Sequence, residues 1–368
     1  MAKKKKSPKK TNAIKVRWIR FPKDATANLE SSLKSPKAHA IVGGIRSGKS
    51  SLLELLGSKH KKIIDLYGSR DNEGLAWLRS PFKDSVLLLK GQSAKVDCNC
   101  ADVMNTIDVK LKDLEKYKVV ISVSSFYSRI EEEWYSISKF FDKLWHRTHW
   151  HEPWCVLIRE ASNLVYSRLS LGETQQMAKS YMIYVIREMR HCGFALVIDT
   201  IRWHSIDIDL RTIADYTFIK AQGIEGLPRS LRFVYRYFKP YGVMRMPVNK
   251  FIILSRHGPI GFGSSICPPW HKQEKENLLA KFDIRTSYSE LPYNAERGFG
   301  RVSDYEHLRI IKARIETGKG MEKLAEDLGR SSKTIFKHIN VHNNMIHAVG
   351  ECDRCLRVGS PFAKQLID

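Results

Sequence analysis

The stretch Gly43-Gly44-Ile45-Arg46-Ser47-Gly48-Lys49-Ser50 decides the fold of this chain. It fits the pattern G-x-x-x-x-G-K-[ST] at every fixed position and follows the apolar run 38–42, which has the length of a buried strand. A helix-forming segment, 51–56, comes next. A strand, a glycine-rich loop and a helix in this order place backbone N–H groups and a helix N-terminus around a phosphate group. The alternative is a glycine-rich turn that matches by chance, and the flanking segments argue against it.

This motif predicts a site for ATP and Mg²⁺. Lys49 is expected to reach the β and γ phosphates, and the Ser50 hydroxyl is expected to ligate Mg²⁺. The predicted nucleotide-binding residues are those of the loop and of the start of the helix: Gly43, Gly44, Ile45, Arg46, Ser47, Gly48, Lys49, Ser50 and Ser51.

Continuous apolar runs recur after the loop, and such runs are typical of parallel strands covered on both faces. They are 62–67, 86–89, 119–123, 154–158, 194–198 and 216–220, with helical patterns at 130–149 and 177–190. Strands that alternate with helices predict an α/β fold, here a P-loop NTPase with a mostly parallel sheet. A further strand is expected at 251–255 and a charged helix at 273–282, while 12–35 is expected to lead into the sheet.

The composition narrows the class of protein. A formal net charge of +23 and a pI near 9.7 predict a polyanionic partner, most often nucleic acid, with a membrane surface as the alternative. No run approaches the roughly 18 apolar residues of a membrane span, so we expect no membrane protein. Six lysines within 2–10 lack a following apolar segment, which argues against a secretory signal and favours a phosphate-binding arm or a solvated tail. The odd number of cysteines, seven, indicates a reducing, cytoplasmic location.

A second motif follows the apolar run 154–158. Glu160 would be delivered to the same sheet edge as the P-loop, where it is expected to be the general base that activates water. Arg159 stands where the first of two acids is expected. We therefore expect Mg²⁺ to be held more weakly, and the guanidinium to compete for phosphate charge. ATP binding should then survive better than turnover.

With these motifs the chain resembles the HerA/FtsK superfamily of P-loop ATPases, ring-forming motors that pump DNA and include viral genome-packaging enzymes. The resemblance covers roughly 38–220. It rests on the P-loop, on the strand that ends at Glu160, and on Arg190-His191-Cys192-Gly193 before a strand leading into Thr200-Ile201-Arg202. The segment Ile208-Asp209-Leu210-Arg211 follows the family loosely.

The resemblance implies a motor that acts on double-stranded DNA as a homo-oligomer, a hexameric ring. It also implies that Arg190 or Arg202 reaches a neighbouring subunit's γ-phosphate as an arginine finger, and a salt bridge within the subunit is the alternative. The chain departs from the family at Arg159 and at Ile201, which replaces the glutamine that senses the γ-phosphate.

The carboxyl-terminal part changes to short helices, expected at 305–316, at 321–328 and from Ser331 or Ser332 through Ile339. Their apolar residues have the spacing of a helix-turn-helix, whose third helix enters the major groove: Leu324, Ala325, Leu328, Ile335 and Ile339. The residues expected to contact DNA are Arg330, Ser331, Ser332, Lys333, Thr334, Lys337 and His338. The alternative is a small all-α bundle that docks on a partner subunit.

Cys352 and Cys355 form a Cys-x-x-Cys pair with His342 and His347 upstream. Four such side chains can complete a tetrahedral Zn²⁺ site. The alternative is a reduced cysteine pair and a histidine near a helix C-terminus.

We therefore expect a basic tail at 1–11, a P-loop ATPase domain at 12–285, a linker at 286–303, a helix-turn-helix DNA-binding domain at 304–345 and a tail with the zinc candidate at 346–368. The expected function is an ATP-hydrolysing motor that translocates or packages double-stranded DNA in a prokaryotic or viral context. The alternative is a nucleotide-gated DNA-binding regulator or replication initiator with little turnover.

Overall fold

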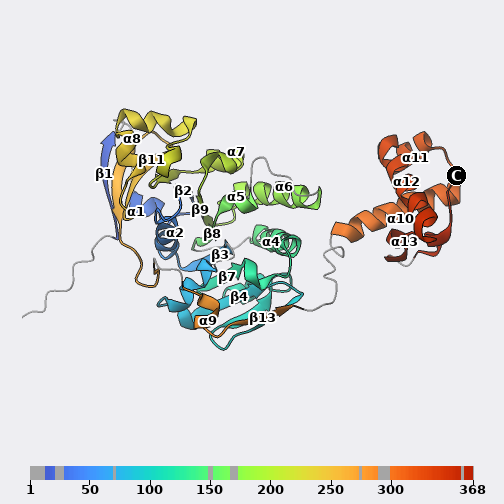
Figure 1. The fold of residues 1–368 in the computed structure, drawn as a ribbon, viewed down its shortest axis with the longest axis horizontal. Coiled ribbons are helices and arrows are strands. Elements are labelled where there is room, and N and C mark those ends of the chain that lie inside the picture. The colour runs from blue at the N-terminus through green and yellow to red at the C-terminus, as the bar shows by residue number, and fades with distance from the viewer. Residues whose placement is uncertain are drawn as a thin grey trace, which may run out of the picture. The chain divides into compact units, whose positions relative to one another are not determined.

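The computed structural model describes residues 13–20, 29–68, 72–147, 152–165, 173–272, 276–288, 299–357 and 360–367. The chain divides into two compact units, Met1–Leu291 and Pro292–Asp368, each of which is described by itself (Figure 1). The basic tail expected at 1–11 lies outside the described residues.

The first unit is built on an 11-stranded sheet with the order β1-β12-β11-β10-β2-β9-β8-β3-β7-β4-β6. From β10 to β6 all neighbouring strands are parallel. These strands are β2 (Ala38–Val42), β3 (Lys62–Gly68), β4 (Val86–Lys90), β6 (Asp102–Asn105), β7 (Val119–Val123), β8 (Trp154–Ile158), β9 (Phe194–Thr200) and β10 (Tyr216–Ile219). The antiparallel edge is formed by β1 (Ile14–Arg20), β12 (Ile260–Ser265) and β11 (Lys250–Ser255). The predicted α/β fold with a mostly parallel sheet is confirmed.

Helices cover both faces of this sheet. Leu52 and Leu56 of α2 (Lys49–Gly57) share an apolar cluster with Val197 of β9, while α4 (Ile130–Trp145) and α6 (Glu173–Glu188) lie on the opposite side (Figure 1). The remaining helices of the unit are short: α1 (Leu29–Ser32), α3 (Leu111–Leu114), α5 (Ala161–Leu164), α7 (Ile208–Ile213), α8 (Pro240–Met244) and α9 (Leu278–Lys281). Every residue of β2, β7, β8 and β9 is buried, as expected of strands covered on both faces.

Several edge elements differ from the prediction. β1 lies within the segment expected only to lead into the sheet, and β12, with the sequence IGFGSS, has too few large apolar residues to be recognised as a strand. Both are formed by pairing with an existing sheet edge rather than by their own apolar pattern. In the described part of the segment expected to be a helix at 273–282, only α9 is helical. β13 (Arg285–Tyr288) pairs with β5 (Ala94–Asp97), so this part of the expected linker belongs to the first unit.

The second unit contains α10 (Phe299–Thr317), α11 (Met321–Leu328), α12 (Ser332–Val349) and α13 (Asp353–Arg357). Its buried residues include four of the apolar positions predicted from helical spacing: Leu324, Ala325, Ile335 and Ile339. Gly329, at φ 62°, ends α11, and Ser331 caps α12 by accepting a hydrogen bond from the backbone N of Thr334 at 3.2 Å. None of the helices in the described parts of the chain combines the length and the apolar character needed to cross a membrane.

Candidate nucleotide site

The glycine-rich loop connects β2 to α2 in the arrangement that the motif predicts. Arg46 (φ 59°) and Gly48 (φ 83°) both take left-handed backbone conformations, and turns of this kind can direct N–H groups toward an anion. Gly43 is required for a different reason. A Cβ atom at this position would lie 2.6 Å from Cβ of the buried Lys220 and 2.6 Å from Oγ of Ser47, so only glycine fits.

The loop is tied to the strands on either side of β2. The backbone N of Gly43 donates to the carbonyl of Thr200 at 3.2 Å, and the backbone N of Gly44 donates to the carbonyl of Ala221 at 2.7 Å. Lys49 is buried, and its Nζ donates to the carbonyl of Gly44 at 3.1 Å, which holds the ammonium group beneath the loop. These hydrogen bonds fix the position of the loop between β9 and β10.

Glu160 lies two residues beyond the end of β8 and is the N-cap residue of α5. Its φ is 44°, a conformation that a residue other than glycine rarely adopts and that is often found at functional sites. Because β2, β9 and β8 are adjacent and parallel, their carboxyl ends meet at one sheet edge. The structure thus places Lys49 and Glu160 at the same edge. The fold is that of a P-loop NTPase.

Asp199, which sequence reasoning missed, lies between these two residues. It is near the end of β9, opposite Ile41 of β2, and its Oδ1 accepts a hydrogen bond from the backbone N of Glu160 at 2.5 Å. Burial, and then the charge of Glu160, raise the pKa of this carboxyl to about 7, while the ammonium of Lys49 acts in the opposite direction. The strand was expected to end at Ile198. Parallel strands end at the same edge of a sheet. If the pairing of β9 with the P-loop strand β2 had been known, this rule would have identified Asp199.

The raised pKa of Asp199 predicts a pH-dependent stability. Between the ordinary value of 3.8 and about 7, the folded chain binds the proton more tightly than the unfolded chain, so the free energy of unfolding falls as pH rises. We expect Asp199→Asn, measured without nucleotide, to be more stable than wild type at pH 8, by up to about 4 kcal/mol. This difference should shrink toward pH 5. The thermal unfolding midpoints of the wild-type protein and of the variant between pH 5 and pH 8 measure this difference. A difference that does not change with pH would contradict the raised pKa of Asp199.

Arg159 takes a different position from the one expected. Its Nη2 lies 2.7 Å from Oδ2 of Asp65 and 3.0 Å from Oε1 of Glu54, and its Nη1 lies 3.5 Å from Oε2 of Glu73. The side chain is buried under α2, where these carboxylates neutralise it. Burial alone would lower the pKa of the guanidinium, but the charges of Asp65 and Glu54 hold it well above its ordinary value. The expectation that Arg159 competes for phosphate is therefore wrong.

An open cleft of about 1010 Å³ lies beside the loop. Its lining includes loop residues 44–47 together with Ile201 and Arg202, and a smaller hollow beside it is lined by Ile45, Glu160 and Arg202, among others. Arg202 is therefore at the site of its own chain. Arg190 is exposed and precedes β9, which puts it at the opposite edge of the sheet.

The predicted DNA-contacting residues lie around the start of α12. Five are exposed: Arg330, Ser331, Ser332, Lys333 and Lys337. Thr334 is half-buried, and its Oγ1 lies 2.8 Å from Oγ of Ser331. His338 differs from the expectation that it faces DNA. Its Nδ1 lies 3.1 Å from Nδ1 of the buried His307, so the ring is turned toward the interior of the unit.

Comparison with known proteins gives structural likenesses only. No family model and no curated protein matches the sequence. The genome packaging NTPase B204 of Sulfolobus turreted icosahedral virus 2 with ATP-gammaS is similar at 16% identity and a TM-score of 0.37, over 62% of this chain and 97% of that one. EssC (ATPases 2 and 3) of Geobacillus thermodenitrificans is similar at 12% identity and a TM-score of 0.40, over 67% and 42%. The pCW3 conjugation coupling protein TcpA with ATPgS is similar at 11% identity and a TM-score of 0.37, over 70% and 67%.

Proposed function

We propose that the first unit binds and hydrolyses ATP, and that the chain works as an oligomeric motor on double-stranded DNA. The observation that carries this proposal is the convergence of Lys49, Asp199 and Glu160 at one sheet edge beside an open cleft. In this assignment the loop N–H groups and Lys49 bind the phosphates. Glu160 takes a proton from the attacking water as the general base.

The residues at this edge fit Mg²⁺. Ser50 stands in the first turn of α2, and Asp199 is a buried carboxylate whose pKa is raised by burial and by the charge of Glu160, so a bound cation would favour its ionised form. Mg²⁺ prefers oxygen ligands and, when bound, neutralises charge on the β and γ phosphates. Ser50 would hold the ion, and Asp199 would supply the carboxylate that is missing at position 159.

Arg202 would contact the nucleotide bound to its own chain, whereas Arg190 would contact the nucleotide of a neighbouring subunit. Arg202 lines the cleft of its own chain, where it would contact the bound phosphates. Arg190, at the opposite sheet edge, would reach a phosphate only in a neighbouring subunit. This difference supports an arrangement in which an oligomer completes the site, as a ring does.

A nucleotide-gated DNA-binding switch is the second candidate, and Ile201 favours it because the family's sensing glutamine is absent. Arg159 does not favour the switch, because Glu54 and Asp65 neutralise its charge. A DNA-stimulated ATPase assay, together with a sizing run with and without ATP, separates the two. A stimulated rate in a ring-sized oligomer supports the motor, whereas a monomer or dimer with negligible turnover supports the switch.

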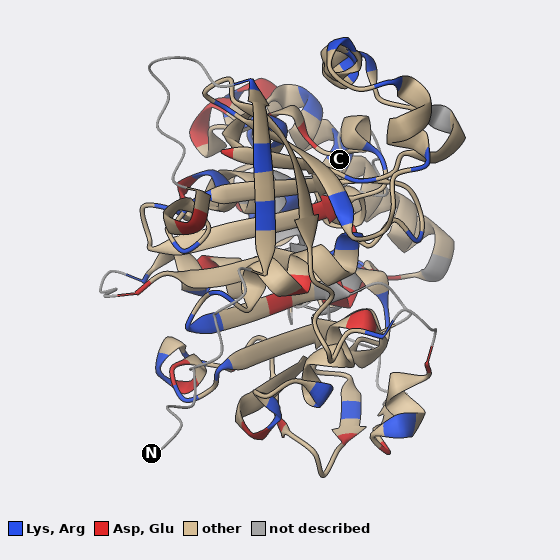
Figure 2. Cartoon of the chain, turned by 90° about the vertical axis from the view of Figure 1, so that its left-hand side faces the viewer, with Lys and Arg blue, Asp and Glu red and all other residues tan. Residues whose placement is uncertain are grey.

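Basic residues on both units support DNA as the partner. Lys15 and Arg17 project from the edge strand β1, which Figure 2 shows with its basic bands toward the viewer. In the second unit, Lys333 and Lys337 are exposed near the start of α12, the position of a recognition helix. A docking role for the second unit is the alternative.

We expect the double variant Lys333→Glu and Lys337→Glu to weaken binding of the full chain to duplex DNA at least tenfold at moderate salt, because two phosphate contacts are replaced by repulsion. Titration of a labelled duplex measures the affinity. Lys312→Glu with Lys364→Glu changes the net charge equally at exposed positions elsewhere in the unit and should have the smaller effect. Equal losses in the two double variants would show that net charge, and not this helix, binds the DNA.

A further inference from the structure

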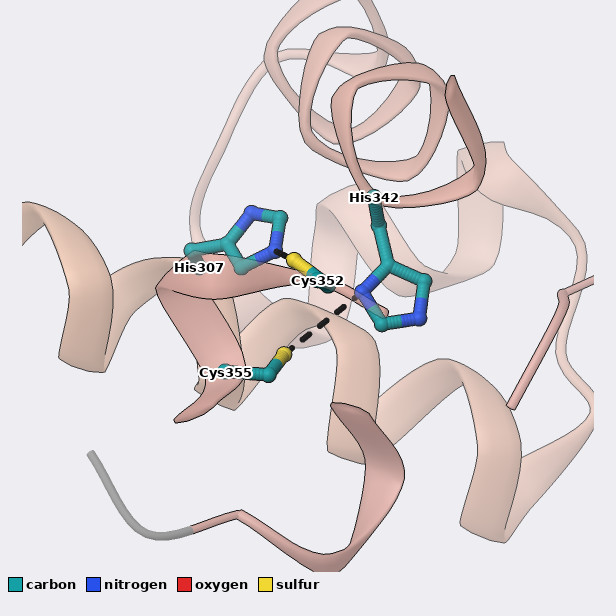
Figure 3. Close-up of side chains that lie close together, drawn as sticks. All are labelled: His307, His342, Cys352 and Cys355. Carbon is teal, nitrogen blue, oxygen red and sulfur yellow. Dashed lines mark hydrogen bonds between the residues drawn. The ribbon is translucent and has the colours of Figure 1, made fainter. Parts of the chain in front are cut away.

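We propose that the second unit holds a structural Zn²⁺ ion bound by His307, His342, Cys352 and Cys355. These side chains come from α10, from α12 and from the segment around α13 (Figure 3). All four are buried, and their candidate ligand atoms lie within 4.8 Å of one another. The ion would fasten two long helices to the carboxyl-terminal segment. The proposal does not depend on ATP hydrolysis or on DNA binding.

The spacing of the ligand atoms matches a tetrahedral zinc site. Nε2 of His307 lies 3.4 Å from Sγ of Cys352, and Nδ1 of His342 lies 3.5 Å from Sγ of Cys355. Bonds of about 2.3 Å to sulfur and about 2.0–2.1 Å to nitrogen, at tetrahedral angles, separate sulfur from nitrogen by about 3.5 Å. The two pairs therefore need little movement to take up the ion.

The outer partners of both histidines leave the correct nitrogen facing the centre. Nε2 of His342 lies 2.8 Å from the carbonyl of Gln365, which can only accept, so this nitrogen carries the proton and the Nδ1 lone pair faces Cys355. On His307, Nδ1 faces His338 and Nε2 faces Cys352. Zinc-bound histidines commonly have such a partner on the second nitrogen, because it fixes the orientation of the ring.

The surroundings of the cluster also favour a metal. Cys352 and Cys355 belong to the apolar core of the unit, together with Ile310, Ile335 and Ile339. Four polar side chains converging in a small core are costly unless they are satisfied, and zinc satisfies all of them at once. Units of this size often need a metal or disulfides to supplement a limited core. A plain reduced cysteine pair would not account for two histidines oriented toward it.

This ligand set corrects the sequence-based one. His347 is exposed on α12, and His307, far upstream on α10, takes its place. Sequence spacing missed His307 because the packing of α10 against α12 and α13, not proximity in the chain, brings it to the cysteines.

The test is the zinc content and the cobalt spectrum of the purified full chain. We expect one zinc ion per chain. After replacement by Co²⁺, we expect the intense visible bands of a tetrahedral site and a thiolate charge-transfer band in the near ultraviolet. His307→Ala should lose most of the zinc, whereas the matched variant His347→Ala should retain it. Cys355→Ser should lose the charge-transfer intensity, whereas Cys98→Ser should not.

Two results would overturn the proposal. One is a wild-type chain that contains no zinc and gives no tetrahedral spectrum with Co²⁺. This measurement on the wild-type chain tests the site even if a variant fails to fold. The other is a His347→Ala variant that loses zinc while His307→Ala retains it. His338→Ala, which removes an outer partner, should weaken metal affinity by about 10- to 100-fold and keep the tetrahedral spectrum.

Discussion

We expect the Glu160→Gln variant to hydrolyse ATP about 10²- to 10⁴-fold more slowly than the wild-type chain, with ATP affinity largely unchanged. The amide keeps the size of the side chain but cannot take a proton from water. The backbone N of residue 160 can still donate to Asp199, so the local structure should persist. Phosphate release at saturating ATP measures the rate, and a fluorescent ATP analogue measures the affinity.

Glu152→Gln is a suitable control, because Glu152 is an exposed carboxylate that pairs with Lys61 near the start of β8. It should leave the rate unchanged. An unchanged rate in Glu160→Gln would refute the assignment of the base, and the neighbouring Asp199 would then be the next candidate. Loss of ATP binding in Glu160→Gln would instead indicate that Glu160 has a structural role.

The second large effect concerns stability. We expect Arg159→Met to lower the free energy of unfolding by about 3–5 kcal/mol, because it leaves two buried carboxylates without their cation. Asp65 accepts from Nε and Nη2 of Arg159 as well as from Nε1 of Trp77, and Glu54 is also contacted by His271. Burial opposes ionisation of Glu54, but the hydrogen bond from His271 and the charge of Arg159 lower its pKa below the ordinary value. Chemical denaturation at neutral pH measures the loss.

Arg17→Met, an exposed arginine on the edge strand β1, provides the matched control and should change stability little. Combining Arg159→Met with Asp65→Asn should recover part of the loss, since it removes one of the uncompensated charges. A loss no greater than that of Arg17→Met would show that the cluster contributes little. ATP affinity in Arg159→Met should stay close to wild type as long as the unit is folded, because the ion-pair partners of Arg159 among the described residues, Glu54, Asp65 and Glu73, lie outside the loop.

The local features of the candidate site could be predicted from the sequence. The P-loop, its flanking strand and helix, and Glu160 at a strand end were all recognisable, because fixed spacing and apolar runs depend on neighbours in the chain. The roles of Lys49, Glu160, Arg190 and Arg202 remain predictions. Arg159 was misjudged because its position in the motif does not reveal which strand lies beside β8. Only the pairing of β3 with β8 brings Asp65 within reach of its guanidinium.

The sequence by itself determined that this protein has a parallel sheet with a phosphate-binding loop and a basic helical region at its carboxyl end. These properties are carried by residues a few positions apart, where the helix and strand periods act directly. Tertiary structure alone decided that Asp199 lies between Lys49 and Glu160, and that His307 joins the cysteines. In both cases the partners come from separate segments, and the order of strands or the packing of helices brings them together.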